Sequence, residues 1–208
     1  MKEKTGLVLE GGGIRGAYTA GALRWLSERG IYFDYGVGIS SGAAYLALYT
    51  AKEMQIAKDM ATGFSVDPRN VGLKALLRCG HFVDGDRIFT HYLKDVEGFR
   101  VDQLRKASLL MEVGVYDLDL GKTMYYSNKE LDDDMQLIRA ACSLPIASDV
   151  VHFKGRKLLD GGITKMIPIE RAKEMGCEKI LVITTKPSDY VRKPASKVIK
   201  LLMRLVYY

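Results

Sequence analysis

Two glycine-rich turns lie within forty residues of each other near the start of the chain. The first, Gly11 to Gly16, follows a short apolar run, Thr5 to Leu9, which is typical of a buried strand. The second, Gly38 to Gly42, follows a second short apolar run, and helical patterns cover residues 14–29 and 41–57. A strand, helix, strand and helix in succession predict a parallel α/β sheet.

The rest of the chain continues this pattern except in one segment. Residues 109–126 carry a hairpin signal, 152–159 resemble a strand or hairpin, and 179–185 are typical of a buried strand. Residues 59–98 contain many turn signals, so we expect short helices and loops that cover one face of the sheet. Residues 197–208 predict a basic apolar helix. Packing on the sheet is the favoured position for it, and an anionic membrane surface is the alternative.

Composition bounds the class of protein. The 208 residues, of which 48% are apolar, suit one globular domain over 1–208, and the net charge of +6 is moderately basic. The motifs fall within about 5–186, and the chain is expected to be either complete or shortened at Tyr208. Three widely spaced cysteines without a CxxC pair favour reduced thiols and a cytoplasmic protein, with peripheral contact at the inner membrane face as an option. We expect no nucleic-acid partner, and the oligomeric state is open.

The first glycine turn has two interpretations. Gly11, Gly13 and Gly16 match the GxGxxG pattern of dinucleotide-binding loops. A dinucleotide-binding fold also needs an acidic residue at the far end of the second strand. Asp34 instead precedes this strand, and Ser40 occupies its far end, so a nucleotide site is the less favoured alternative.

The favoured interpretation of the same turn is an anion cradle. Consecutive backbone N–H groups at a helix N-terminus bind negative charge, and glycine permits close approach of the backbone. Such a cradle can hold the oxyanion of a tetrahedral intermediate, where each donor contributes about 3 kcal/mol. Arg15 either adds charge there or forms a structural salt bridge.

The second turn has the pattern of a nucleophile elbow. Gly38 and Gly42 stand two residues on either side of Ser40, between an apolar strand and an Ala-rich helix. This context lifts a serine hydroxyl above the sheet. Ser41 is adjacent but does not fit the spacing.

A nucleophilic serine needs a base. His81 and His91 lie in the segment that is hardest to interpret, with no motif around them, and His152 lies in a strand-like segment. Asp149 followed by His152 has the order of a hydrolase triad, but both would have to act from one loop. Each histidine is more simply a surface or packing residue.

Asp160 is the better candidate for the base. It ends the apolar run Leu158-Leu159 and is followed by Gly161 and Gly162, as at the end of a buried strand with open space beside it. An ordinary Asp-Gly turn is the alternative. The other acidic cluster, residues 132–134, predicts a helix N-terminus rather than a metal site, because no His or Cys at ligand spacing accompanies it.

Three motifs in this order, GGGxRG, GxSxG and DGG, resemble the patatin-like phospholipase family. Residues 141–145 are similar to the small-residue and proline segment of that family, and residues 111–128 to its central strand pair. The resemblance covers residues 5 to about 186, most weakly over 59–98. The chain departs from the family at Gly162, where many members have alanine. It is also expected to end earlier than family members do, which would remove part of the acyl pocket or lid.

The resemblance implies a three-layer α/β/α sandwich with a mostly parallel central sheet, and a reaction without metal or cofactor. Ser40 would be the nucleophile and Asp160 the base, while Gly11, Gly12 and Gly13 would supply the oxyanion hole with Arg15 close by. Substrates would be lipid or lysophospholipid carboxylic esters. A catalytically silent lipid-binding module is a further alternative, motivated by the basic C-terminal segment.

Overall fold

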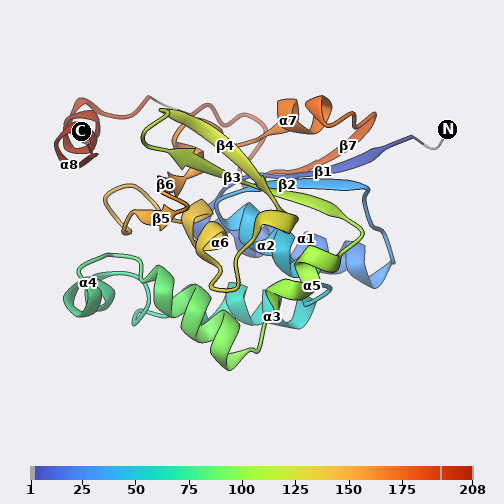
Figure 1. Cartoon of the computed structure of the whole chain (residues 1–208), viewed down its shortest axis with the longest axis horizontal. Coiled ribbons are helices and arrows are strands. Elements are labelled where there is room, and N and C mark those ends of the chain that lie inside the picture. Colours follow the sequence, from blue (N-terminus) through green and yellow to red (C-terminus); the bar gives the residue numbers. More distant parts are fainter. Residues whose placement is uncertain (1–2, 193, 208) are drawn as a thin grey trace.

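The computed structural model describes residues 3–192 and 194–207 and contains one central sheet with helices on both faces (Figure 1). The sheet order is β5-β6-β3-β2-β1-β7, and β4 also pairs with β3. The strands are β1 (Thr5–Leu9), β2 (Tyr35–Ile39), β3 (Leu110–Asp117), β4 (Lys122–Ser127), β5 (Val151–Phe153), β6 (Arg156–Asp160) and β7 (Lys179–Ile183).

The sheet has a parallel part and an antiparallel part. Strands β3, β2, β1 and β7 run parallel, as the alternation of strands and helices predicts. Strands β4 and β6 are antiparallel to β3, and β5 is antiparallel to β6. The predicted α/β class is therefore confirmed. The antiparallel pairs β3–β4 and β5–β6 lie largely in the segments 109–126 and 152–159, for which the sequence predicts a hairpin and a strand or hairpin, respectively.

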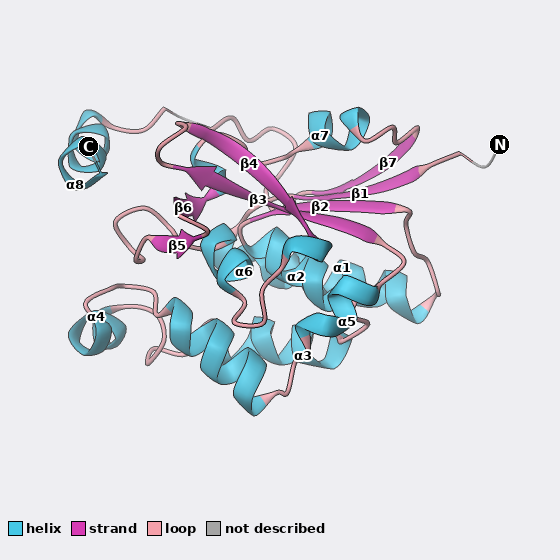
Figure 2. Cartoon of the chain, in the orientation of Figure 1, coloured by secondary structure: helices cyan, strands magenta, loops and turns pink. Residues whose placement is uncertain are grey.

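The two faces of the sheet are covered unequally (Figure 2). One face carries most of the helices and the larger hydrophobic core, which includes α2 throughout its length. The other face carries α7 over a small core of Val8, Tyr35, Val37, Ala172 and Cys177. The helices are α1 (Gly16–Glu28), α2 (Ser41–Thr50), α3 (Met54–Asp59), α4 (Leu73–Cys79), α5 (Val101–Lys106), α6 (Gln136–Ala141), α7 (Ile169–Glu174) and α8 (Lys197–Tyr207).

The segment 59–98 consists of short helices and loops on the larger face, as predicted. Helix α4 lies between two segments of π-helix, Met60–Phe64 and Asp86–Val96. The single helix expected over 41–57 is interrupted, because Lys52 adopts a positive φ of 64° between α2 and α3. The prediction missed this break because lysine is not a turn residue by type.

Two predictions about the C-terminal part are wrong. Strand β7 was expected to be buried, but it is the last strand of the sheet and Leu181 is largely exposed, because no described strand lies on its outer side. Helix α8 was expected to pack on the sheet, but Val198, Leu201, Leu202, Leu205 and Val206 are exposed, and Tyr207 packs against the small cluster of Tyr116, Leu118 and Leu159. Tyr208 of this predicted helix lies outside the described residues.

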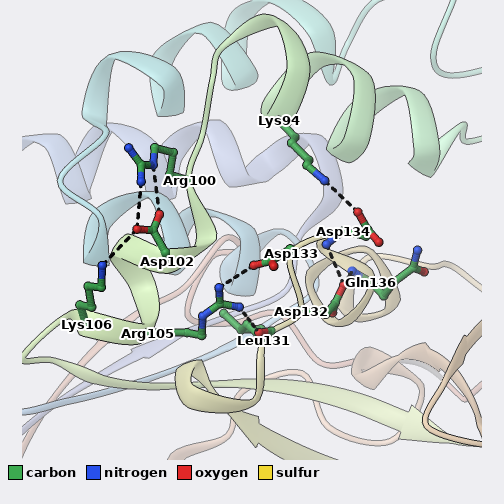
Figure 3. A network of polar contacts seen from close by, with 10 residues as sticks. All are labelled: Lys94, Arg100, Asp102, Arg105, Lys106, Leu131, Asp132, Asp133, Asp134 and Gln136. Atoms are coloured by element: carbon green, nitrogen blue, oxygen red, sulfur yellow. Dashed lines mark hydrogen bonds and ion pairs between the residues drawn. The ribbon is translucent and has the colours of Figure 1, made fainter.

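The acidic cluster 132–134 begins α6, as predicted (Figure 3). The Asp132 carboxylate accepts the backbone N–H groups of Gln136 at 2.8 Å and Leu137 at 3.2 Å. Asp133 and Asp134 form ion pairs with Arg105 and Lys94. All three carboxylates therefore have structural partners, and no group of side chains among the described residues is arranged to hold a metal.

Candidate active site

The C-terminal ends of β2 and β6 meet on one side of β3. Strand β4 occupies one edge of β3 along residues 112–117, so β6 must share the other edge with β2. Ile39 at the end of β2 pairs with Gly114, and Asp160 at the end of β6 pairs with the next residue, Val115. The two strands approach this point from opposite directions, which brings Ser40 and Asp160 together although 120 positions separate them in the sequence.

Ser40 occupies a strained turn between β2 and α2. Its backbone has φ 55° and ψ −133°. Residues other than glycine rarely adopt this conformation, and it often marks a functional site. A Cβ atom at Gly38 would lie 2.6 Å from backbone atoms of Gly42 and Ala43, and one at Gly42 would lie 2.7 Å from the Leu9 carbonyl oxygen. The two flanking glycines are thus required for the tight packing of this turn.

Asp160 is 2% exposed and held by its neighbours. Its backbone N–H donates to the Ser143 carbonyl at 2.8 Å, and its Oδ1 accepts the Gly162 N–H at 2.7 Å. Its Oδ2 has no hydrogen-bond partner among the described residues. The Ser40 hydroxyl lies close enough to lower the pKa of the Asp160 carboxyl, yet its geometry is not that of a full hydrogen bond.

Burial dominates the electrostatics of Asp160. Loss of hydration raises the pKa of its carboxyl from 3.8 to about 6, against the opposing effects of Ser40, the Gly162 amide and the Arg192 charge. A carboxylate with such a pKa is ionised at neutral pH and is a stronger base than an exposed one. A buried carboxyl group near a serine hydroxyl, with one oxygen that no described residue engages, is suited to accept a proton.

The glycine loop approaches the same point. A Cβ atom at Gly11 would lie 2.9 Å from the Ser40 Cβ, so the loop and the elbow are in direct contact. The Gly11 N–H donates to the Met166 carbonyl, and the Gly12 N–H donates to Ser41 Oγ at 3.1 Å. The Gly13 N–H, at a positive φ of 55°, is engaged by none of the described residues, so it is the amide of the three that is available to a ligand.

An apolar cavity of about 190 Å³ opens on one side of Ser40. Gly13 and Ser40 line it, together with residues of α2, the segment 59–98, α6 and the loop after α6. The wall residues include Met60, Val71, Val83, Ile88, Phe89 and Leu144. The segment that was hardest to interpret from sequence therefore forms the cavity beside the serine.

A second cavity, of about 320 Å³, lies on the other side of Ser40 and Asp160. Arg15 and Arg192 both line it, and neither forms an ion pair with a described carboxylate. Arg192 donates from Nη1 to the Gly162 carbonyl at 2.9 Å, which fixes it beside Asp160. This cavity is suited to an anionic group.

The remaining candidates lie elsewhere. Asp34 directly precedes β2 and accepts hydrogen bonds from Thr5 of β1. It therefore lies at the opposite end of β2 from Ser40 and does not lie beside the glycine loop. His81, His91 and His152 line neither cavity. Asp149 forms an ion pair with Arg139.

Sequence reasoning missed three contributors. Ser41 was set aside because of its spacing, but its hydroxyl accepts the Gly12 N–H and so holds the glycine loop. Arg192 lies beyond the recognisable motifs, and no sequence signal marked it. Glu10 also anchors the loop, since it is buried and accepts the backbone N–H of Thr185 beyond β7.

A central sheet with helices on both faces and a serine at a strand–helix turn place the protein in the three-layer α/β/α class. The profile of the patatin-like phospholipase family matches residues 7–173. The chain therefore belongs to the patatin-like phospholipase family, a family of lipid acyl hydrolases, and this confirms the resemblance seen in the sequence.

Curated proteins that are similar to the chain include two uncharacterized ones. The uncharacterized protein YjjU of Escherichia coli K12 is 27% identical over 202 residues, covering 90% of this chain and 54% of that protein. An uncharacterized protein of Archaeoglobus fulgidus is 28% identical over 109 residues, covering 49% of this chain and 75% of that protein. The chain thus spans about half the length of YjjU.

The fold is also similar to a solved structure. The crystal structure of VipD from Legionella pneumophila superposes with a TM-score of 0.54 at 17% identity, covering 79% of this chain and 47% of that one. At this identity the similarity concerns the fold alone. The described residues include no helix of the length and apolar character that a membrane span requires.

Proposed function

We propose that this protein is a serine hydrolase of lipid carboxylic esters, of the phospholipase A or lysophospholipase type. The observation that carries the proposal is the meeting of β2 and β6 along β3, with a serine in a strained elbow beside a buried carboxylate whose pKa is raised. Ser40 is the nucleophile in this proposal and Asp160 its base. No histidine is needed.

In the proposed reaction the ester carbonyl lies beside Ser40, with the acyl chain in the apolar cavity. Asp160 Oδ2 takes the hydroxyl proton as Ser40 Oγ bonds to the carbonyl carbon. The resulting oxyanion is stabilised by the available Gly13 N–H and the positive end of the helix that follows. Gly11 and Gly12 shape the loop, since their amides are already engaged.

The tetrahedral intermediate then expels the alcohol, which takes the proton from Asp160, and the acyl group remains on Ser40 Oγ. A water molecule attacks the acyl-enzyme, with Asp160 again accepting a proton. The fatty acid leaves, and the proton returns to Ser40. Arg15 and Arg192 line the cavity on the leaving-group side, which favours alcohols that carry a phosphate.

The test is intact mass after reaction with a fluorophosphonate, together with hydrolysis of a soluble p-nitrophenyl ester. We expect one adduct on the wild type and none on Ser40→Ala. Ester turnover should fall at least about 1,000-fold in Ser40→Ala and in Asp160→Asn, as in other serine hydrolases. Ser27→Ala, on α1, is the matched control. Full turnover in either active-site variant, with the fold intact by circular dichroism, would exclude the dyad.

A further inference from the structure

The loop between α6 and β5, residues 142–150, connects the active site to the surface. Its first residues line the apolar cavity, and Leu144 lines both cavities. Ile146 is 41% exposed and has a φ of 68°, which is a rare conformation for a β-branched residue. The loop therefore exposes Leu144, which lines both cavities together with Ser40, and Ile146 two residues further on.

Helix α4 is attached to one side of this loop. The Val83 N–H donates to the Ala147 carbonyl at 2.9 Å, and Val83 also forms a β-bridge with Val71, so both ends of the α4 segment are fixed at the cavity wall. The helix carries Leu73 and Leu77 outward, the latter 81% exposed, and Phe82 follows it. Large apolar side chains thus surround the cavity on this side.

Helix α8 is attached to the other side of the loop. The Ile146 N–H donates to the Tyr207 hydroxyl at 2.7 Å. Exposed Val198, Leu201, Leu202 and Leu205 recur at helical spacing, and Leu205 is 72% exposed. An apolar stripe without a partner among the described residues thus lies near the site.

Positive charge accompanies these apolar residues. Lys197, Lys200 and Arg204 flank the stripe of α8, and none forms an ion pair with a described carboxylate. Lys74 lies on α4 between the exposed leucines. In Figure 1 both helices lie toward the end of the molecule that is opposite the N-terminus, with the β5–β6 hairpin between them.

We infer that this face, formed by α4, Leu144, Ile146 and α8, docks on an anionic lipid bilayer. Basic residues attract anionic head groups, and the apolar side chains enter the boundary with the acyl chains. The inference rests on the proposed function for its purpose, because the docked face opens the apolar cavity toward the membrane. Lipid binding itself does not require turnover.

The test uses the full chain carrying Ser40→Ala, so that substrate is not consumed. Flotation with vesicles of phosphatidylcholine and about 30% phosphatidylglycerol measures the partition coefficient of the protein between water and the bilayer. We expect binding to these vesicles and at least about tenfold weaker binding to pure phosphatidylcholine, or in high salt. Adding Leu77→Asp and Leu205→Asp should reduce binding at least about tenfold. Val96→Asp, an exposed valine at the end of a π-helical segment, is the matched control.

Several outcomes would overturn the inference. One is vesicle binding by the double aspartate variant that equals that of the control, and another is the absence of vesicle binding by the parent chain. Dimerisation in solution that the double variant abolishes would assign the face to a second copy of the chain instead. Hydrolysis of a soluble ester by the wild-type protein carrying the two aspartate substitutions, without Ser40→Ala, separates the two proposals. Unchanged turnover with lost vesicle binding supports the docking face. Absent turnover with retained vesicle binding counts against the proposed hydrolase activity and not against the docking face.

Discussion

The strand–turn–helix unit around Ser40 and the segment 59–98 both border the apolar cavity, yet they are built differently. In the first, glycines are required by close backbone contacts: a Cβ atom at Gly38 would lie 2.6 Å from backbone atoms. In the second, a Cβ atom at Gly63 or Gly72 would meet nothing within 4 Å. The first region holds the backbone around Ser40 in one geometry, while the second only has to enclose a volume.

This difference explains why one region can be recognised in a sequence and the other cannot. A backbone contact of 2.6 Å admits only glycine, so geometry imposes a pattern of residue types. A cavity wall needs only apolar side chains of suitable size, which many sequences supply. We therefore expect chemistry to respond to changes in the first region, and substrate selection to respond to changes in the second.

The largest effect is expected from a matched pair of glycine substitutions. Gly38→Ala should destabilise the protein by at least about 3 kcal/mol and abolish ester hydrolysis, because backbone atoms cannot move away from the new methyl group. Gly63→Ala should stabilise it by about 0.5 kcal/mol, since Gly63 is exposed within a helical segment at an ordinary φ. Urea denaturation and kcat/KM on a soluble ester measure both. Equal effects of the two substitutions would remove the contrast between the regions.

The second prediction concerns the effect of burying the Asp160 carboxyl on the stability of the fold. The pKa of its carboxyl is raised from 3.8 to about 6 in the folded protein, so between these values the folded state binds more protons than the unfolded state. Stability is therefore lost as pH rises through this window, by about 3 kcal/mol above pH 6. Asp160→Asn should recover about this amount at pH 8 and almost none at pH 4.

Activity should follow the opposite trend, because the base must be ionised. We expect kcat/KM of the wild type to rise with pH up to about 6 and then to level off. Thermal unfolding at pH 4 and 8 and a pH–rate profile measure the two trends, with the exposed Asp119→Asn as control. A variant Asp160→Asn that is less stable at pH 8 would show that the carboxylate is stabilising, contrary to this account.

The parts of the fold that sequence predicted are those in which local rules act. Strand β1 and the hairpin that ends at Asp160 follow from apolar runs bounded by turn residues. The exposure of Leu181 in β7 could not be predicted, because an edge strand and a central strand of a parallel sheet have similar sequences. The position of Arg192 depends on how the chain returns across the sheet after β7, which is not a local property.

The same limit applied to the active site. The motifs indicated Ser40 and Asp160 by type, but their convergence depends on a register that places Ile39 opposite Gly114 and Asp160 opposite Val115. Nor does spacing show that Ser41 engages the Gly12 amide. Candidate residues can therefore be named from sequence, whereas the availability of each backbone amide requires the structure.

The third prediction tests the segment 59–98 as the part that selects substrates. Val83→Phe should fill part of the apolar cavity of about 190 Å³. The ratio of kcat/KM for a decanoyl ester to that for a butyryl ester should fall about 30-fold, because a lost binding volume of a few methylene groups discriminates on this scale. Hydrolysis of the butyryl ester should change little. Val96→Phe, outside the cavity, is the control, and an equal ratio in both variants would place the acyl chain elsewhere.

The smallest effect is expected at Arg192, which comes from neither region and lines the other cavity. Arg192→Ala should lower the ratio of kcat/KM for an anionic lysophospholipid to that for a neutral monoacylglycerol about fivefold, since an exposed charge is partly screened by solvent. Arg192→Lys should retain most of this preference, and salt should reduce it in the wild type. The arginine charge also lowers the pKa of Asp160, so removing it should move the acidic limb of the pH–rate profile to higher pH. A shifted limb with an unchanged substrate ratio would assign Arg192 to the base alone, and an unchanged limb and ratio would remove it from the site.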